Sequence, residues 1–247
     1  PGHIGARLGF FGSTAMQRIL VTGANRGLGL EFTRQLLARG DRVIATCRHP
    51  GKALALTELA ATHPGHLHIL PLDLSSERSI AEAVRETAAL TDTLDALINN
   101  AGMLVSGERF GSITHKSLTD SFAANVAGPV LLTQALAPLL ERGKNPRVMN
   151  LSSRLGSLAG TQSFGTPSYA ISKAALNMAT RQLAATLAPQ GIAVFCVSPG
   201  WVSTDMGGAN APVAPQNSVA GLLKVLDATT KDDAGRFVDY KGAEIAW

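Results

Sequence analysis

Short apolar runs rich in β-branched residues alternate with longer segments of helical periodicity along this chain, from Met16 onward. The strand-like runs are Arg18–Val21, Arg42–Cys47, His66–Leu70, Leu94–Ile98, Arg147–Leu151, Ile192–Val197 and Arg236–Val238. The helical segments between them are Leu30–Arg39, Lys52–Ala60, Ser76–Leu90, Thr114–Leu140, Pro167–Ala188 and Asn217–Asp227. Regular alternation of this kind predicts an α/β fold with a doubly wound parallel sheet of about seven strands and helices on both faces.

Residues 1–15 do not follow this pattern. They contain one arginine and no acidic residue, and the first strand-like run begins only after Met16. Pro1 is not a translation start, and the apolar part of the segment is too short for the core of a signal peptide. We expect a leader or non-native segment here and a single folded domain over residues 16–247.

The composition argues against several classes of protein. The chain has 22 basic and 18 acidic side chains, a net charge of +4, and no run of lysine or arginine, so we expect no nucleic-acid partner. No apolar run is long enough to span a membrane, and we expect none to do so. Cys47 and Cys196 lie in or at the end of apolar runs, which predicts buried free thiols in a reducing, cytoplasmic compartment and no metal site.

A glycine-rich loop, Thr22-Gly-Ala-Asn-Arg-Gly-Leu-Gly29, follows the first strand-like run and precedes the first helical segment. Gly23 permits a tight turn, while Gly27 and Gly29 let the backbone approach a pyrophosphate and let the helix pack closely on the sheet. N–H groups at the start of the helix can bind phosphate oxygens. The residues expected to bind a dinucleotide here are Gly23, Asn25, Arg26, Gly27, Leu28 and Gly29; the alternative is a simple turn.

The end of the second strand-like run indicates which dinucleotide binds. Sites for NAD usually have an acidic residue there, which binds the ribose 2′-hydroxyl. This run instead ends Thr46-Cys47-Arg48, and Arg26 in the glycine loop points to the same region. Two guanidinium groups without a carboxylate suit the 2′-phosphate of NADP(H). The alternative is that both are solvated surface arginines.

Further polar residues and glycines follow the later strand-like runs, where an open parallel sheet binds its ligands. We expect Asp73, with Leu74, to contact the adenine, and the stretch Asn100, Ala101 and Gly102 to line the cofactor. We expect Pro199, Gly200, Val202 and Thr204 to bind the nicotinamide carboxamide. An Asx-turn or helix cap at Asp73 and an ordinary loop at Asn100 are the alternatives.

Tyr169 and Lys173 lie four residues apart in a helical segment, which places them on one face, one turn apart. A nearby ammonium favours the phenolate, so we expect Lys173 to lower the pKa of Tyr169 from its usual value of about 10. Such a pair can give a proton to a developing alkoxide or take one from an alcohol. A hydroxyl of the pair Ser152-Ser153 can bind a substrate carbonyl. Taken alone, Tyr169 and Lys173 also fit a half-buried tyrosine beside an exposed lysine. The serine pair alone also fits a polar strand end.

Taken together, the motifs Thr-Gly-x-x-x-Gly-x-Gly, Asn-Asn-Ala-Gly, Ser, Tyr-x-x-x-Lys and Pro-Gly resemble those of the single-domain branch of the short-chain dehydrogenase/reductase family. The stretches Thr22–Glu31, Ser152–Ser157, Ser172–Met178 and Pro199–Gly208 resemble the subgroup of C-factor-like proteins and sniffer-type carbonyl reductases. The resemblance covers nearly all of residues 16–247. It implies a Rossmann-type fold with strand order 3-2-1-4-5-6-7, and a homodimer or homotetramer.

The resemblance also implies roles for four residues. Tyr169 would be the general acid in reduction, and Lys173 would lower its pKa and bind the nicotinamide ribose. Ser153, as the second serine of its pair, would orient the carbonyl. Asn125, in the stretch Ala124–Pro129, would hold a water that links Lys173 to solvent.

These features predict an NADPH-dependent reductase that converts an aldehyde, ketone or quinone to an alcohol. We expect Gly102–Gly111, Arg154–Thr166 and Met206–Pro215 to form the substrate side of the site. One alternative is an NADP-binding signalling or regulatory protein of C-factor type with little turnover. Another is an epimerase or dehydratase of the larger nucleotide-sugar branch, which usually has a Gly-x-x-Gly-x-x-Gly loop in place of the loop found here.

Overall fold

The computed structural model describes residues 16–247; the leader or non-native segment predicted at residues 1–15 lies outside the described residues. Seven strands form one sheet in the predicted order β3-β2-β1-β4-β5-β6-β7, and each neighbouring pair is parallel. The strands are β1 (Arg18–Thr22), β2 (Arg42–Cys47), β3 (Leu67–Pro71), β4 (Ala96–Asn99), β5 (Arg147–Leu151), β6 (Ala193–Ser198) and β7 (Phe237–Asp239). The helices are α1 (Gly27–Ala38), α2 (Leu54–Thr62), α3 (Glu77–Leu90), α4 (His115–Phe122), α5 (Gly128–Glu141), α6 (Pro167–Leu187) and α7 (Pro215–Ala228).

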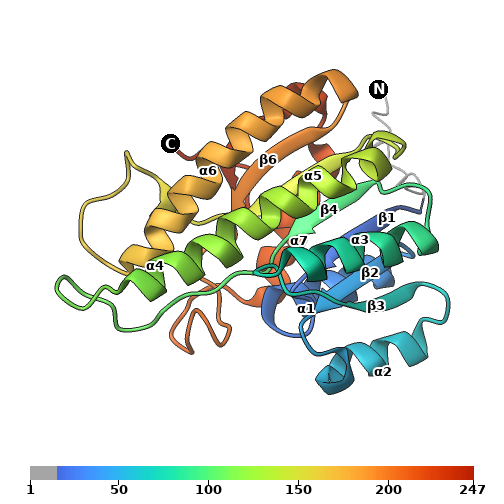
Figure 1. The fold of residues 1–247 in the computed structure, drawn as a ribbon, viewed down its shortest axis with the longest axis horizontal. Helices are drawn as coiled ribbons and strands as arrows, with labels where there is room; N and C mark the ends of the chain where they lie inside the picture. The colour runs from blue at the N-terminus through green and yellow to red at the C-terminus, as the bar shows by residue number, and fades with distance from the viewer. Residues whose placement is uncertain (1–15) are drawn as a thin grey trace, which may run out of the picture.

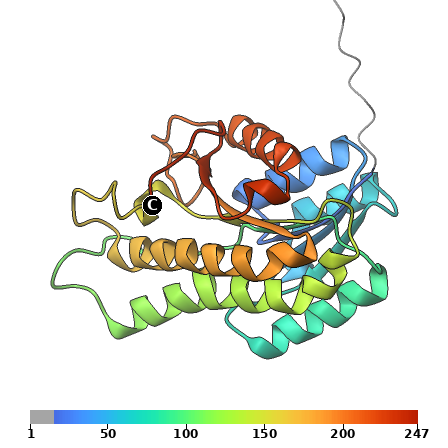
Figure 2. The ribbon, with the colours of Figure 1, turned by 90° about the horizontal axis from the view of Figure 1, so that it is seen from above.

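Helices cover both faces of the sheet, as predicted (Figures 1 and 2). On one face, α1 and α7 pack through residues such as Phe32 and Leu222 into an apolar cluster that includes Val21 of β1. On the other face, α5 packs through Leu132 into a second cluster that includes Leu20 of β1. Because successive residues of a strand point to opposite faces, β1 to β6 each contribute to both clusters, while β7 contributes Val238 to the first. The parallel arrangement brings the carboxyl ends of the strands to one edge of the sheet.

Most element boundaries lie within two residues of the prediction, and two elements differ by more. Helix α1 begins at Gly27, inside the glycine loop, rather than at Leu30. The predicted helix Thr114–Leu140 is interrupted by a π-helical segment, Ala123–Ala127, between α4 and α5. Segments of this kind are frequent at functional sites, because the extra residue turns a side chain away from the regular helical register.

The helix His115–Glu141, which comprises α4, the π-helical segment and α5, is long and apolar enough to cross a membrane by length and composition alone. Half of its most apolar window is buried inside the structure. In α5, Leu132 and Leu136 are fully buried against the sheet. Core helices pass the same test, so this helix is accounted for by packing within the fold.

Candidate active site

The ends of β1 and β4 are joined at the start of the glycine loop. Thr22 Oγ1 accepts hydrogen bonds of 3.0 Å from the backbone N–H groups of Asn100 and Ala101. The Asn100 Nδ2 donates in return to the carbonyls of Thr22 and Gly23, at 2.8 and 3.2 Å. Asn100 and Ala101 therefore hold the glycine loop in place. Both residues are also predicted to line the cofactor.

Two glycines of this loop have no room for a side chain. A Cβ added to Gly29 would lie 2.1 Å from the Gly23 carbonyl oxygen and 2.5 Å from Asn100 Nδ2. Gly23 has a φ of 64°, in the left-handed region that favours glycine, and its Cβ would lie 2.9 Å from the Cα of Ala101. The first turn of α1 is thus pressed against the loop, with its N–H groups at the carboxyl edge of the sheet, as a phosphate site requires.

The segment after β6 lies against the same loop. A Cβ on Gly27 would be 3.7 Å from Cγ2 of Thr204, so these two predicted cofactor residues face each other. Next to them, Arg26 Nη1 forms an ion pair of 3.0 Å with Asp205 Oδ2. Both side chains are well exposed, at 66% and 78%. Arg26 is therefore an exposed arginine with an acidic partner, and its other N–H donors remain open to solvent.

The ends of β2 and β3 place Arg48 near Asp73. Asp73 Oδ1 accepts hydrogen bonds from the backbone N–H and the hydroxyl of Ser75, at 2.9 and 2.6 Å. These bonds lower the pKa of Asp73, and the positive charge of Arg48 lowers it further. Asp73 is thus a carboxylate in a turn, as in the alternative considered above, and also an acceptor beside the predicted adenine position. Leu74 next to it is buried.

Tyr169 and Lys173 lie in the first turns of α6, with the Lys173 ammonium 5.4 Å from the centroid of the Tyr169 ring. Lys173 is 4% exposed, and its Nζ donates a hydrogen bond of 2.6 Å to the Leu151 carbonyl at the end of β5. The Ser153 side chain lies close enough to the Tyr169 phenol to lower its pKa. The structure therefore brings the predicted serine, tyrosine and lysine together at the carboxyl edge of the sheet.

Asn125 lies within the π-helical segment and is fully buried. Its Oδ1 accepts a hydrogen bond of 2.8 Å from Met103 N, and its Nδ2 donates to Met103 O and to Ser172 Oγ, each at 2.9 Å. A Cβ on Gly102 would lie 3.2 Å from Asn125 Oδ1 and 3.6 Å from Lys173 Nζ. Asn125 and Lys173 therefore border the same small space beside Gly102, where the predicted water would lie.

Asn177, one turn beyond Lys173 on α6, is a site residue that sequence reasoning does not single out. Its Oδ1 accepts from Ser152 Oγ at 2.6 Å, and its Nδ2 donates to the Gly156 carbonyl at 3.0 Å. Ser152 is therefore occupied in the interior, whereas Ser153 lies near Tyr169. The only signal in the sequence is an amide side chain at helical spacing from Lys173.

A sequence model described as short chain dehydrogenase matches residues 17–213. The chain belongs to this short-chain dehydrogenase family. The C-signal protein of Myxococcus xanthus is 40% identical over 161 residues, which are 65% of this chain and 97% of that protein. An NADPH-bound carbonyl reductase from chicken fatty liver is 36% identical, with a TM-score of 0.89 over 94% of this chain and 99% of its own. The carbonyl reductase Sniffer of D. melanogaster is 34% identical, with a TM-score of 0.89 over 94% of this chain and 100% of its own.

The protonation states in this short-chain dehydrogenase are governed by burial. Burial raises the pKa of Tyr169 to about 12, and the hydrogen bond with Ser153 opposes this only in part. Burial also lowers the pKa of Lys173 to about 8. The net pKa of Tyr169 is therefore raised and not lowered as predicted, because the effect of burial on the phenol dominates.

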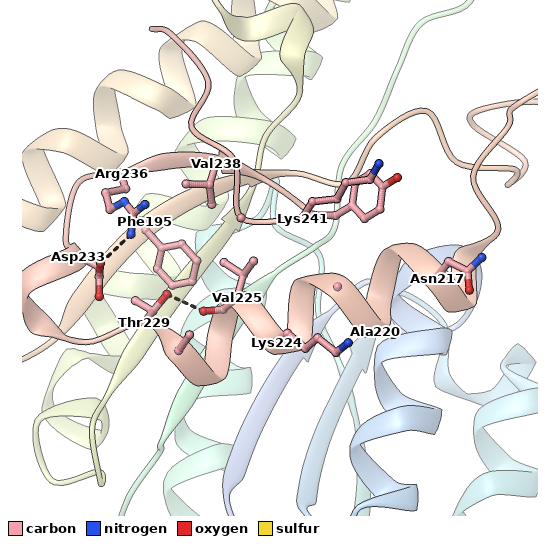
Figure 3. A pocket seen from close by; sticks show the side chains of 14 residues that line it. Phe195, Asn217, Ala220, Lys224, Val225, Thr229, Asp233, Arg236, Val238 and Lys241 are labelled. Atoms are coloured by element: carbon pink, nitrogen blue, oxygen red, sulfur yellow. Dashed lines mark hydrogen bonds and ion pairs between the residues drawn. The ribbon is translucent and has the colours of Figure 1, made fainter. Parts of the chain in front are cut away.

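A cavity of about 610 Å³ lies away from these residues, between α7 and the segment that follows β7 (Figure 3). Phe195, Val225 and Val238 form its apolar part, and Lys224 and Lys241 are among its polar lining residues. None of the predicted site residues lines it. The candidate active site of this short-chain dehydrogenase is thus defined by its side-chain geometry at the carboxyl edge of the sheet, and not by this cavity.

Proposed function

We propose that this oxidoreductase reduces an aldehyde, ketone or quinone to an alcohol with NADPH, and that Tyr169 is the general acid. The observation that carries the proposal is the meeting of Tyr169, Ser153 and Lys173 beside a glycine loop of dinucleotide-binding geometry. The NADPH-bound state of the chicken carbonyl reductase supports the choice of cofactor.

The residues present fit a bound NADP(H). The cradle formed by Gly23, Gly27 and Gly29 keeps side chains away from the start of α1, where a pyrophosphate would bind. Gly102 leaves open the space bordered by Asn125 and Lys173. Lys173 uses one hydrogen bond on the Leu151 carbonyl, so further N–H donors of its ammonium are available for ribose hydroxyls.

In the proposed mechanism, NADPH supplies the hydride that reaches the carbonyl carbon. The Ser153 hydroxyl holds the carbonyl oxygen next to the Tyr169 phenol. Because its pKa is raised to about 12, the phenol is protonated at neutral pH and can give its proton to the oxygen as negative charge develops there. The Lys173 ammonium then stabilises the resulting phenolate. Proton return to Tyr169 follows the path through Lys173 and a water held at Asn125.

NADPH oxidation with a broad panel of aldehydes, ketones and quinones tests this function. Turnover with at least one carbonyl, and alcohol formed in equal amount, supports it. Tight NADPH binding without turnover of any carbonyl contradicts it, and would favour the regulatory alternative.

The pH profile provides a second test through Lys173. Its pKa is lowered to about 8, so the ammonium is present below that pH and lost above it. We expect kcat/KM for NADPH, measured in the direction of reduction, to fall as the pH rises through about 8. In Lys173→Arg, whose guanidinium keeps its charge, the remaining activity should show no break there. A flat wild-type profile up to about pH 9.5 would contradict the assignment.

The ion pair of Arg26 with Asp205 gives a test of cofactor choice. If Arg26 binds the 2′-phosphate, the Asp205 carboxylate competes with it for the same guanidinium charge. Exposed ion pairs contribute about 0–1 kcal/mol, so Asp205→Asn should tighten NADPH binding by up to about fivefold. NADH binding, followed by fluorescence titration, should not change. Asp232→Asn, at an exposed acid without an ion pair among the described residues, is the matched control. Equal effects on both cofactors would show that Arg26 does not select NADPH.

We propose a homodimer or homotetramer through the outer faces of α4 and α6. Four large apolar side chains on these helices are exposed: Leu118, Phe122, Ile171 and Met178. Contiguous exposed apolar surface usually marks an interaction site. A light-scattering mass equal to that of one chain would contradict this arrangement.

A further inference from the structure

Glu108 connects the loop after β4 to the start of α6. Its Oε2 accepts a hydrogen bond of 3.1 Å from Ser168 N, and a second from the Ser168 hydroxyl. Ser168 is 1% exposed and directly precedes Tyr169 in the chain. The Glu108 carboxylate therefore binds the residue next to the proposed general acid, although Glu108 lies 60 positions before Ser168 in the sequence.

Helix α6 has no side-chain cap from its own N-terminal residue. Thr166, at the N-cap, makes no capping hydrogen bond, and Pro167 has no N–H. The Ser168 N–H is thus the first donor of the helix, and Glu108 accepts from it. A carboxylate is well suited to this position, because the start of a helix has free donors and partial positive charge.

The backbone before Tyr169 is also strained. Thr166 has a φ of 42° and a ψ of 55°, in the left-handed region that residues with a Cβ rarely occupy. Such a conformation persists only where the surroundings hold it. Two contacts from the loop after β4 lie on either side of Thr166 in the chain: Glu108 with Ser168, and Phe110 edge-on to Phe164, with ring centroids 5.7 Å apart. Figure 1 shows this loop and the loop before α6 extending at the same end of α4 and α6.

The hydrogen bonds from Ser168 also fix the charge of Glu108. Burial raises the pKa of Glu108, but hydrogen bonds, including those from the Ser168 hydroxyl and N–H, outweigh it, and the net pKa is lowered. The group is therefore an ionised carboxylate at neutral pH.

We propose that Glu108 is a positioning residue for Tyr169: it caps α6, holds the strained turn at Thr166 and so keeps the phenol in place beside Lys173. The inference rests on the proposed function for its kinetic consequence. The placement of the phenol, however, can be measured without any turnover.

The first test is kinetic. Misplacement of a reacting group by about 1 Å can cost about 100-fold in rate, so we expect Glu108→Ala to lower kcat by about 10- to 100-fold. The solvent isotope effect on kcat should rise, because proton transfer from Tyr169 becomes rate-limiting. The Kd for NADPH should stay within about twofold, since Glu108 does not touch the glycine loop. Glu108→Gln keeps an acceptor for the Ser168 N–H, so its kcat should lie between those of the wild type and Glu108→Ala.

The second test follows the ionisation of Tyr169 directly. The chain has two tyrosines, so Tyr240→Phe leaves Tyr169 as the only phenol. In that background, a phenol with a pKa of about 12 stays almost fully protonated at about pH 10.5, whereas a solvated phenol is mostly ionised there. Tyrosinate absorbance at this pH should therefore be near zero with Glu108 present and large in Glu108→Ala.

The outcomes separate the two hypotheses. Wild-type kcat in Glu108→Ala, an unchanged isotope effect, or a phenol that stays protonated overturns the positioning role. Absence of carbonyl turnover in the wild type contradicts the proposed function, while the titration still decides the placement of Tyr169. Glu77→Ala, at an exposed acid in the first turn of α3, is the matched control and should change neither readout. If Glu108→Ala does not fold, Glu108→Gln is used for both measurements.

Discussion

Replacing Tyr169 with phenylalanine is expected to lower kcat for carbonyl reduction by about 10²–10⁴-fold, the usual contribution of a positioned acid. Phenylalanine keeps the ring that packs beside Lys173 and removes only the hydroxyl that hydrogen bonds to Ser153. Ser153 is only partly buried, so water can replace the lost partner, and the fold should be unaffected. Single-turnover kinetics with NADPH and an active carbonyl measure the effect on the chemical step.

The control for this variant is Tyr240→Phe, at the other tyrosine of the chain, which lines the separate cavity between α7 and the segment after β7. It should retain wild-type turnover. NADPH binding to Tyr169→Phe should remain close to wild type, because the glycine loop and the segment after β6 are unchanged. Retained turnover in Tyr169→Phe would exclude Tyr169 as the acid, whereas lost NADPH binding would mean that its main role is structural.

A methyl group at Gly29 is expected to weaken NADPH binding by about 5- to 150-fold, equivalent to about 1–3 kcal/mol of overpacking. The added Cβ of Gly29→Ala would lie 2.1 Å from the Gly23 carbonyl and 2.5 Å from Asn100 Nδ2. Gly23 belongs to the glycine loop proposed to bind the phosphates, and Asn100 holds that loop, so either the loop or the first turn of α1 must shift. Calorimetric titration with NADPH measures the loss.

Gly51→Ala is the matched control for this substitution. A Cβ at Gly51 meets nothing within 4 Å, and its backbone lies outside the left-handed region. It should leave both NADPH affinity and the unfolding temperature unchanged. Wild-type affinity in Gly29→Ala would mean that the cofactor does not depend on the close approach of α1 to the glycine loop.

Local patterns were enough to predict the architecture. The alternation of apolar runs with helical segments led to the strand positions, and the motif order led to the family and the sheet order, which the structure confirms. The helix Thr114–Leu140 shows the limit of such reasoning. Its periodicity predicts one regular helix, but the π-helical segment at Asn125 is associated with hydrogen bonds to Met103 and Ser172, which lie in other parts of the fold.

The sequence by itself determined which residues could take part in the chemistry, because glycine loops, strand ends and Tyr-x-x-x-Lys spacing are set by neighbours along the chain. The tertiary structure alone decided their state. It paired Arg26 with Asp205, directed Ser152 to Asn177 and placed Glu108 at the start of α6. It also surrounded Tyr169 and Lys173 with protein, which raises one pKa and lowers the other. Burial and partners distant in sequence produce these effects, and neither can be read from local spacing.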